Sequence, residues 1–97
     1  MIRNVPISER IKLIRESERL SRAEASDAWA LKADALWRYE NGKTVPNAEV
    51  ISKMLSHPRF VKYALWFMTG ETFPDGNQIS PALYLPENYQ PKDEESA

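Results

Sequence analysis

Two signals for helix ends, about twenty residues apart, constrain most strongly how this chain can fold. Ser21 and Glu24 have the spacing of a capping box, in which each side chain accepts a hydrogen bond from a free backbone N–H of the first helical turn. Asn41 and Gly42 tolerate the left-handed backbone that closes a helix. No Gly or Pro lies between the two signals, so helix propensity alone predicts one continuous helix from Ser21 to Asn41.

Two further helices flank this segment. Ser8 is a good N-cap, and the residues that follow it up to Arg19 carry apolar side chains at helical spacing, which predicts a helix over residues 9–19. On the other side, Asn47 can cap a helix over residues 48–55.

A last helix is predicted from Pro58 to Thr69. Proline suits the first turn of a helix because its missing N–H has no partner there in any case, and Gly70 is a suitable stop. Apolar side chains lie on almost every side of this segment, which predicts either the most buried helix or an interface.

The chain changes character after residue 70, which suggests a helical domain over residues 1–70 and an extension over residues 71–97. Four prolines interrupt the extension, and its end is acidic. The apolar residues within 78–86 predict an extended arm on its own domain or on a second subunit, and a disordered tail is the alternative. The apolar residues are Ile79, Leu83, Tyr84 and Leu85, and the prolines are Pro74, Pro81, Pro86 and Pro91.

The net charge of −1 hides a difference between the two parts of the chain. Residues 1–70 hold twelve Lys and Arg against eight Asp and Glu, a net of +4, whereas residues 71–97 have a net of −5. A domain that binds nucleic acid often has a larger basic excess, so the charge by itself supports that function only weakly. A chain of 97 residues also buries a modest share of its surface, which favours a partner or a dimer.

The composition makes several other functions improbable. The chain has no cysteine and one histidine, His57, so it offers neither a thiolate nucleophile nor a set of metal ligands. Its three glycines form no phosphate-binding loop, and neither enzymatic activity nor a cofactor is expected. The longest apolar run, residues 63–68, is far shorter than the roughly 20 residues of a membrane span. We therefore expect a soluble cytoplasmic protein with no membrane contact.

The central segment resembles the helix-turn-helix of the Cro/cI-type (XRE-type) phage-repressor family. The likeness rests on Leu20, Ser21 and Glu24 and on the run Glu40-Asn41-Gly42-Lys43, and it extends over residues 8–70 because the segment 66–70 (WFMTG) resembles the family's usual ending. It implies an all-α, five-helix, lambda-repressor-like DNA-binding domain, with the central segment split into helices at about 21–29 and 32–41. Three residues depart from the family pattern, which are Ala25, Ala30 and Lys32.

The resemblance also implies a sequence-specific regulator of transcription that binds double-stranded DNA, and it favours a repressor. The second helix of the pair would lie in the major groove. Helical spacing turns the same side chains outward that contact bases in this family, and these are Lys32, Ala33, Asp34, Trp37 and Arg38. Arg38 suits a guanine edge, whereas Lys32 suits a phosphate and Ala33 a thymine methyl group.

Two of these residues allow more than one interpretation. Asp34 could accept a hydrogen bond from cytosine, or it could orient Arg38 one helical turn further on. Trp37 could pack on a sugar or a thymine methyl group, cover the core beside Trp29, or join a protein interface.

The resemblance assigns roles outside the second helix as well. Arg22, Asn41, Lys43 and Thr44 are predicted to contact phosphates on either side of the helix pair. Arg15 and Glu40 are predicted to form a salt bridge between the first helix and the end of the recognition helix, the alternative being two unrelated surface charges.

A homodimer is expected, because one helix-turn-helix makes few contacts with DNA and the family usually binds inverted half-sites. The extension could also bind a second regulatory protein. The competing hypothesis is a domain of the same fold that acts through protein contacts, such as an antitoxin or an accessory regulator.

Overall fold

The computed structural model describes residues 5–89 and has the predicted all-α architecture with five α-helices. Within that range, the extended structure is limited to one isolated antiparallel bridge between Phe73 and Gln78. The α-helices are α1 (Ile7–Ser17), α2 (Arg22–Ala28), α3 (Ala33–Glu40), α4 (Ala48–Ser56) and α5 (Ala64–Thr69). Three short 3-10 helices accompany them, which are η1 (Val61–Tyr63), η2 (Pro74–Gly76) and η3 (Pro86–Tyr89).

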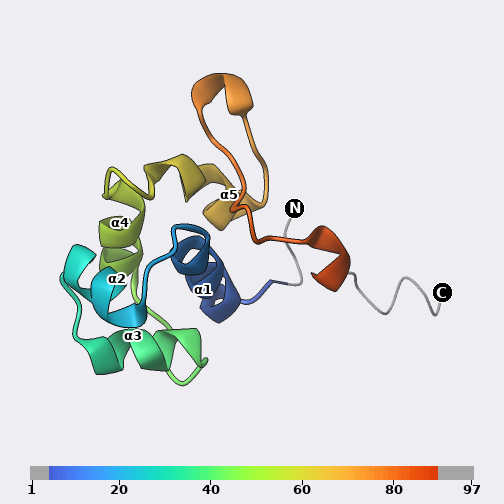
Figure 1. Cartoon of the computed structure of the whole chain (residues 1–97). Helices are drawn as coiled ribbons and strands as arrows, with labels where there is room; N and C mark the ends of the chain where they lie inside the picture. The colour runs from blue at the N-terminus through green and yellow to red at the C-terminus, as the bar shows by residue number, and fades with distance from the viewer. Residues whose placement is uncertain (1–4, 90–97) are drawn as a thin grey trace, which may run out of the picture.

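The helices surround a single hydrophobic core, with α1 near the middle and α2 and α3 together on one side (Figure 1). Ile11 and Ile14 of α1 are fully buried, and so are Leu36 of α3 and Met54 of α4. Aromatic side chains fill the remaining space between the helices, and the largest are Trp29, Phe60, Trp66 and Phe67. The core therefore joins the helix pair to the rest of the domain.

The central segment is divided into two helices, as the resemblance implied and contrary to propensity. Ser21 and Glu24 form the predicted capping box at the start of α2. The helix ends at Ala28, and Ala30 adopts a positive φ of 54°, which turns the chain before α3. The Lys53 ammonium group donates to the Ala30 carbonyl at 3.4 Å. Trp29, packed on Phe60 with ring centroids 4.7 Å apart, anchors the turn to the core.

The first helix is shifted towards the N-terminus from its predicted position. Pro6 is the N-cap and Ser8 lies inside the helix, so the prediction that Ser8 caps it was wrong. The extended backbone of Pro6 already places its carbonyl where the Arg10 N–H can bond to it at 3.0 Å. The helix ends at Ser17 rather than at residue 19, because Arg19 takes a positive φ of 59°.

A charged cluster fixes this early end of α1. The Glu18 carboxylate accepts hydrogen bonds from the Tyr63 hydroxyl at 2.5 Å and the Arg59 guanidinium at 2.9 Å, and it pairs with Lys62 at 3.0 Å. Burial raises the pKa of the Glu18 carboxyl, but these three donors outweigh burial and lower it below its usual value. The cluster therefore holds the end of α1 against η1.

The fifth helix is shorter than predicted and is broken near its middle. Residues 61–63 form η1, and α5 begins only at Ala64 and stops at Gly70, which has the expected positive φ of 82°. Gln78 explains the break, because its side-chain amide accepts from the Leu65 N–H and donates to the Val61 carbonyl. Of the two alternatives for this helix, burial on every side was wrong because Met68 is 61% exposed, whereas an interface stays a prediction.

The extension first forms a hairpin that projects from the domain and then an arm that returns along it (Figure 1). The arm is attached at Pro81, which is buried, and at Tyr84, whose ring lies 5.2 Å from that of Trp66. The Leu83 N–H donates to the Ser17 hydroxyl at 3.1 Å. Residues 78–86 thus pack on their own domain, whereas the acidic end of the chain lies outside the described residues.

The turn of the helix pair generates a stability prediction. Replacing Ala30 by glycine should stabilise the protein by about 1 kcal/mol, because an L-residue with a side chain pays roughly that amount in the left-handed region. For a domain of this size the melting temperature should rise by about 4–8 °C. As a matched control, Ala23→Gly in α2 should lower stability by about 0.5–1 kcal/mol. A melting temperature that falls in both variants would contradict the strain assigned to Ala30.

Candidate nucleic-acid interface

Helix α3 is held against the domain by one of its sides. Leu36 is fully buried, and Tyr39 packs against the same core. Lys32 is the N-cap residue, but its side chain makes no capping hydrogen bond, so packing rather than a cap fixes the start of this helix. These contacts leave the opposite side of α3 facing solvent.

The last residue of α3 forms a buried ion pair with α1. The Arg15 guanidinium donates from Nε to Glu40 Oε2 at 2.6 Å and from its terminal nitrogen to Glu40 Oε1 at 3.0 Å. Both side chains are almost inaccessible, at 9% and 2% exposure. Arg15 also donates to the Leu20 carbonyl at 2.8 Å, which ties the start of the helix pair to the same group. The predicted contact is therefore a two-bond bridge rather than a pair of surface charges.

The exposed side of α3 carries a second, solvent-accessible ion pair. Arg38 donates to Asp34 Oδ2 at 2.9 Å, one helical turn earlier. This hydrogen bond lowers the pKa of the Asp34 carboxyl. Asp34 thus orients Arg38 in the unbound protein, which agrees with the second of the two interpretations of this carboxylate.

Trp37 also lies on this side, with 45% of its surface exposed. The interpretation that Trp37 covers the core beside Trp29 was wrong, because Leu36 occupies the inward position and Trp29 packs on Phe60 instead. Contact with DNA and contact with a protein are the two interpretations of Trp37 that remain.

The loop after α3 is held to the end of that helix by hydrogen bonds that its residues donate to carbonyl groups of α3. The Asn41 side-chain amide donates to the Trp37 carbonyl at 2.8 Å, and the Lys43 N–H donates to the Arg38 carbonyl at 2.9 Å. Gly42 supplies the positive φ of 71° that this closure needs. Lys43 and Thr44 follow with exposed side chains.

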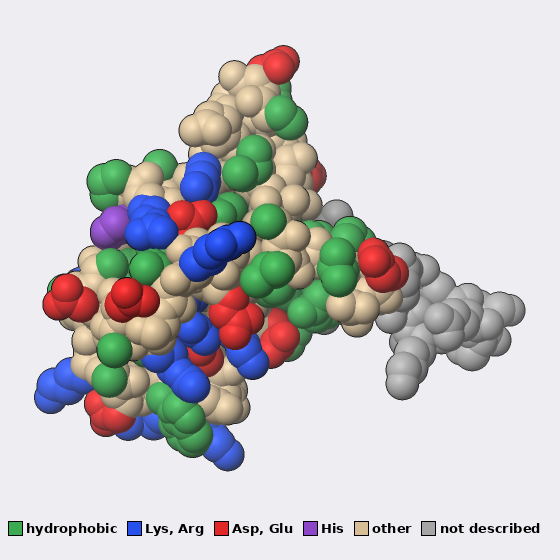
Figure 2. Space-filling view, in the orientation of Figure 1, with side chains coloured by type: hydrophobic (Ala, Val, Ile, Leu, Met, Phe, Trp, Pro, Cys, Tyr) green, Lys and Arg blue, Asp and Glu red, His purple; other side chains and the backbone are tan. Residues whose placement is uncertain are grey.

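Basic side chains gather around the helix pair. Figure 2 shows many Lys and Arg side chains on the lower part of the molecule, with a few acidic side chains between them. In the same orientation, Figure 1 shows α2 and α3 in this part. Arg22, at the start of α2, is 43% exposed and lies 4.0 Å from Glu40. A modest net charge for the whole chain is thus compatible with a locally basic surface.

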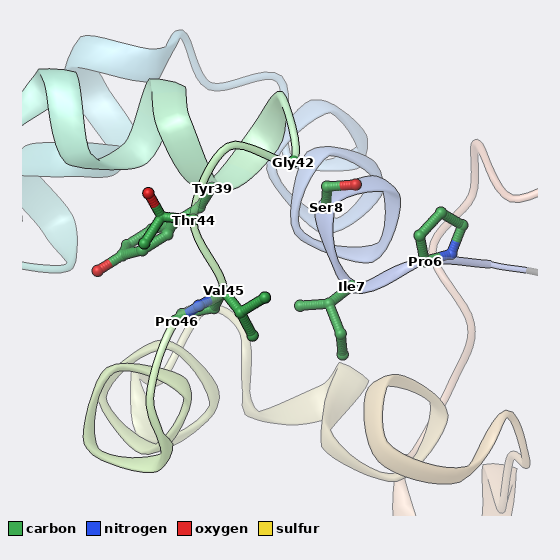
Figure 3. A pocket seen from close by; sticks show the side chains of 8 residues that line it. All are labelled: Pro6, Ile7, Ser8, Tyr39, Gly42, Thr44, Val45 and Pro46. Atoms are coloured by element: carbon green, nitrogen blue, oxygen red, sulfur yellow. The ribbon is translucent and has the colours of Figure 1, made fainter.

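A small hollow adjoins the C-terminal end of α3. It has a volume of about 230 Å³ and is bordered by residues 6–8 on one side and by Gly42 and residues 44–46 on the other, with Ile7 and Val45 facing each other across it (Figure 3). Tyr39 completes the lining, which contains no charged side chain. The lining of the hollow therefore offers no carboxylate, imidazole or amine for acid–base chemistry.

The residues from Val5 to Tyr89 contain no group of three or more His, Cys, Asp or Glu side chains that could hold a metal ion. No helix in this range is long and apolar enough to cross a membrane.

Residues 7–60 match the model of a family described as a helix-turn-helix domain. The chain belongs to this family. It is also 44% identical over 77 residues to Repressor protein C of Escherichia phage P2, an alignment that covers 79% of this chain and 78% of that protein.

The helix-turn-helix brings the predicted site residues together in two groups. The five predicted base-reading residues occupy the N-cap and the outward side of α3. Of the four residues predicted to contact phosphates, Arg22 begins α2, and Asn41, Lys43 and Thr44 follow α3. Their contacts with DNA stay predictions.

The contact between Lys53 and the turn was not predicted from the sequence. Its side chain reaches the turn from α4, a distant helix, and no local pattern indicates such a contact.

The buried bridge generates the prediction for this surface. Arg15→Leu should destabilise the protein by about 3–5 kcal/mol, because the Glu40 carboxylate would stay buried without its main partner. Arg38→Leu, which breaks the exposed pair with Asp34, should cost less than about 1 kcal/mol. Urea unfolding measures both. The double variant Arg15→Leu/Glu40→Leu should regain much of the loss, and equal costs for Arg15→Leu and Arg38→Leu would contradict a special role for the bridge.

Proposed function

We propose that the protein is a sequence-specific regulator of transcription, in particular a repressor, that binds double-stranded DNA with α3 in the major groove. The observation that carries the proposal is the solvent-facing side of α3, which presents Arg38 and Trp37 on a helix fixed by a buried bridge. An α-helix fits the major groove, which displays a distinct donor and acceptor pattern for each base pair. The 44% identity to a protein called Repressor protein C supports the same function.

Within this proposal, Arg38 reads a guanine. Its guanidinium is exposed and already oriented by Asp34, so little side-chain freedom is lost when it makes two hydrogen bonds to the guanine edge. Lys32 at the start of α3 contacts a phosphate or a base near the groove edge. Ala33 leaves room for a base or contacts a methyl group.

Phosphate contacts set the position of α3 in the groove without reading sequence. Arg22 lies at the beginning of α2, so its charge adds to the free N–H groups and the dipole of that helix. Asn41, Lys43 and Thr44 contact the backbone on the opposite flank. The Asn41 side chain already bonds to α3, which makes this flank of the interface rigid.

We further propose a division into a DNA-binding domain over residues 1–70 and an extension that serves a homodimer. Val61 and Met68, near the break in the fifth helix, and Leu83 and Leu85 on the arm are exposed apolar side chains. Apolar side chains of this kind are common in contacts between subunits. A dimer would present two copies of α3 to half-sites one helical turn apart, about 34 Å. The same extension could receive a second regulatory protein.

The second candidate function is that of a protein-contact module of the same fold. It is favoured by the net charge of −1 and by the exposure of Trp37 on α3. The two functions differ in their response to salt, because DNA binding releases counterions and weakens steeply as the salt concentration rises.

Selection of bound sequences from a random duplex pool tests the main proposal, and we expect an enriched motif with inverted half-sites. On that motif Arg38→Ala should lose about 1–3 kcal/mol of binding free energy and should relax base choice at one position in each half-site. Binding to unrelated duplexes should change little. Fluorescence anisotropy titrations with the motif and with a scrambled duplex measure both quantities.

Lys43→Ala is the matched control, because it removes a predicted phosphate contact. It should weaken the motif and the scrambled duplex alike and reduce the salt dependence of binding by about one ion per contact. A pool without any enriched motif, or an Arg38→Ala variant that binds the motif as the parent does, would refute base reading by α3. Affinity that does not depend on salt would support the protein-contact module instead.

A further inference from the structure

An ion pair occupies the centre of the outward side of α3. Leu36 is fully buried, and Tyr39 and Glu40 lie on either side of the same inward direction. At about 100° per residue, Asp34 and Arg38 lie about 160° and 200° around the helix from Leu36, so the two flank the direction that points away from the core. Their side chains are 69% and 47% exposed. Asp34 therefore faces the same partner as Arg38.

The Asp34 carboxylate can accept hydrogen bonds from two groups at once. The hydrogen bond from Arg38 lowers the pKa of this carboxyl, so the group is ionised at neutral pH and acts as an acceptor. That bond is 2.9 Å long and engages Oδ2. An ionised carboxylate has about four lone-pair sites on its two oxygens, so Asp34 can hold Arg38 and still accept from a partner.

Few groups on a DNA duplex suit a carboxylate in this position. Phosphates repel it, and in the major groove guanine presents the acceptors N7 and O6 and thymine the acceptor O4. The donors on the floor of the groove are the exocyclic amino groups of cytosine and adenine. A carboxylate in the centre of the contact therefore favours an amino group and rejects a base that places a carbonyl there.

The distance within the ion pair indicates where such an amino group lies. Arg38 Nη1 and Asp34 Oδ2 are 2.9 Å apart, which is comparable with the separation of about 3.4 Å between stacked base pairs. With Arg38 on a guanine, the Asp34 carboxylate reaches the edges of that base pair or of an adjacent one.

We infer that Asp34 is a specificity-determining residue, whose carboxylate accepts a hydrogen bond from the amino group of a cytosine or adenine within one base-pair step of the guanine. This inference rests on the proposed DNA-binding function. It goes beyond the orienting role of Asp34 in the unbound protein, because it assigns this residue a base contact of its own. The ion pair thus reads an acceptor edge and a neighbouring donor as one unit.

Deletion of single amino groups tests this contact with the full-length protein and the motif obtained by selection. The guanine is the position at which Arg38→Ala relaxes base choice. Each adenine or cytosine within one step of it is replaced in turn by purine or 2-pyrimidinone, which lack only the amino group. One replacement per half-site should weaken binding by about fivefold, the lower end of what one good base contact supplies. Asp34→Ala should bind the intact and the replaced duplexes equally well.

Asp75→Ala is the matched control, because it removes an exposed carboxylate from the hairpin instead of from α3. It should keep the fivefold ratio and bind a scrambled duplex as the parent does. Asp34→Ala should bind the scrambled duplex about twofold more tightly, because a negative charge that faces the phosphates has been removed. Weaker binding of the scrambled duplex by Asp34→Ala would contradict a carboxylate that faces the groove.

The remaining outcomes separate this inference from the proposed function. If the parent protein selects no motif, DNA reading fails and the inference fails with it. If the motif is bound but no amino deletion matters, or if the ratio persists in Asp34→Ala, the inference alone is wrong. Base choice that Asp34→Ala relaxes at the guanine alone would mean that Asp34 acts only by holding Arg38. The response of the parent protein to the deletions does not depend on the folding of any variant.

Discussion

The buried bridge between Arg15 and Glu40 is the interaction on which the DNA-facing geometry depends. It joins the last turn of α1 to the last residue of α3 through two hydrogen bonds, and a rotation of α3 would break both of them. Burying two charges is costly, so such a pair contributes less to stability than its short distances suggest. Its value here is positional, because it fixes which side of α3 faces solvent. The exposed pair of Asp34 and Arg38 then arranges the side chain that reads the base.

Local signals were sufficient to predict much of the fold. The capping box at Ser21, the cap at Asn47 and the stop at Gly70 all act within a few residues, and each lies where the sequence indicated. The division of the central segment was different, because Ala30 is not a residue that favours a left-handed turn. Only the resemblance to a known family predicted that division, and Trp29 and Lys53 show how distant contacts stabilise it.

The wrong bounds of the fifth helix and of the end of the first helix have a common physical cause in contacts between residues far apart in the sequence. The fifth helix is interrupted because Gln78 bonds to backbone groups near residues 61–65. The first helix ends early at a carboxylate held by Arg59, Lys62 and Tyr63 from beyond α4. Trp37 is exposed because Leu36 takes the inward position on α3 and Trp29 packs on Phe60 instead. The DNA-facing residues were predictable as positions on a helix, but their mutual contacts were not.

Backbone amide chemical shifts, recorded by NMR while a duplex of the selected motif is added, test most directly whether the side of α3 fixed by the bridge is the DNA-binding surface. The largest changes should fall on residues 32–44 and on Arg22, and the hairpin around Phe73 should change little. Changes concentrated on the hairpin and α5, with α3 unaffected, would contradict the assignment of α3 to the major groove.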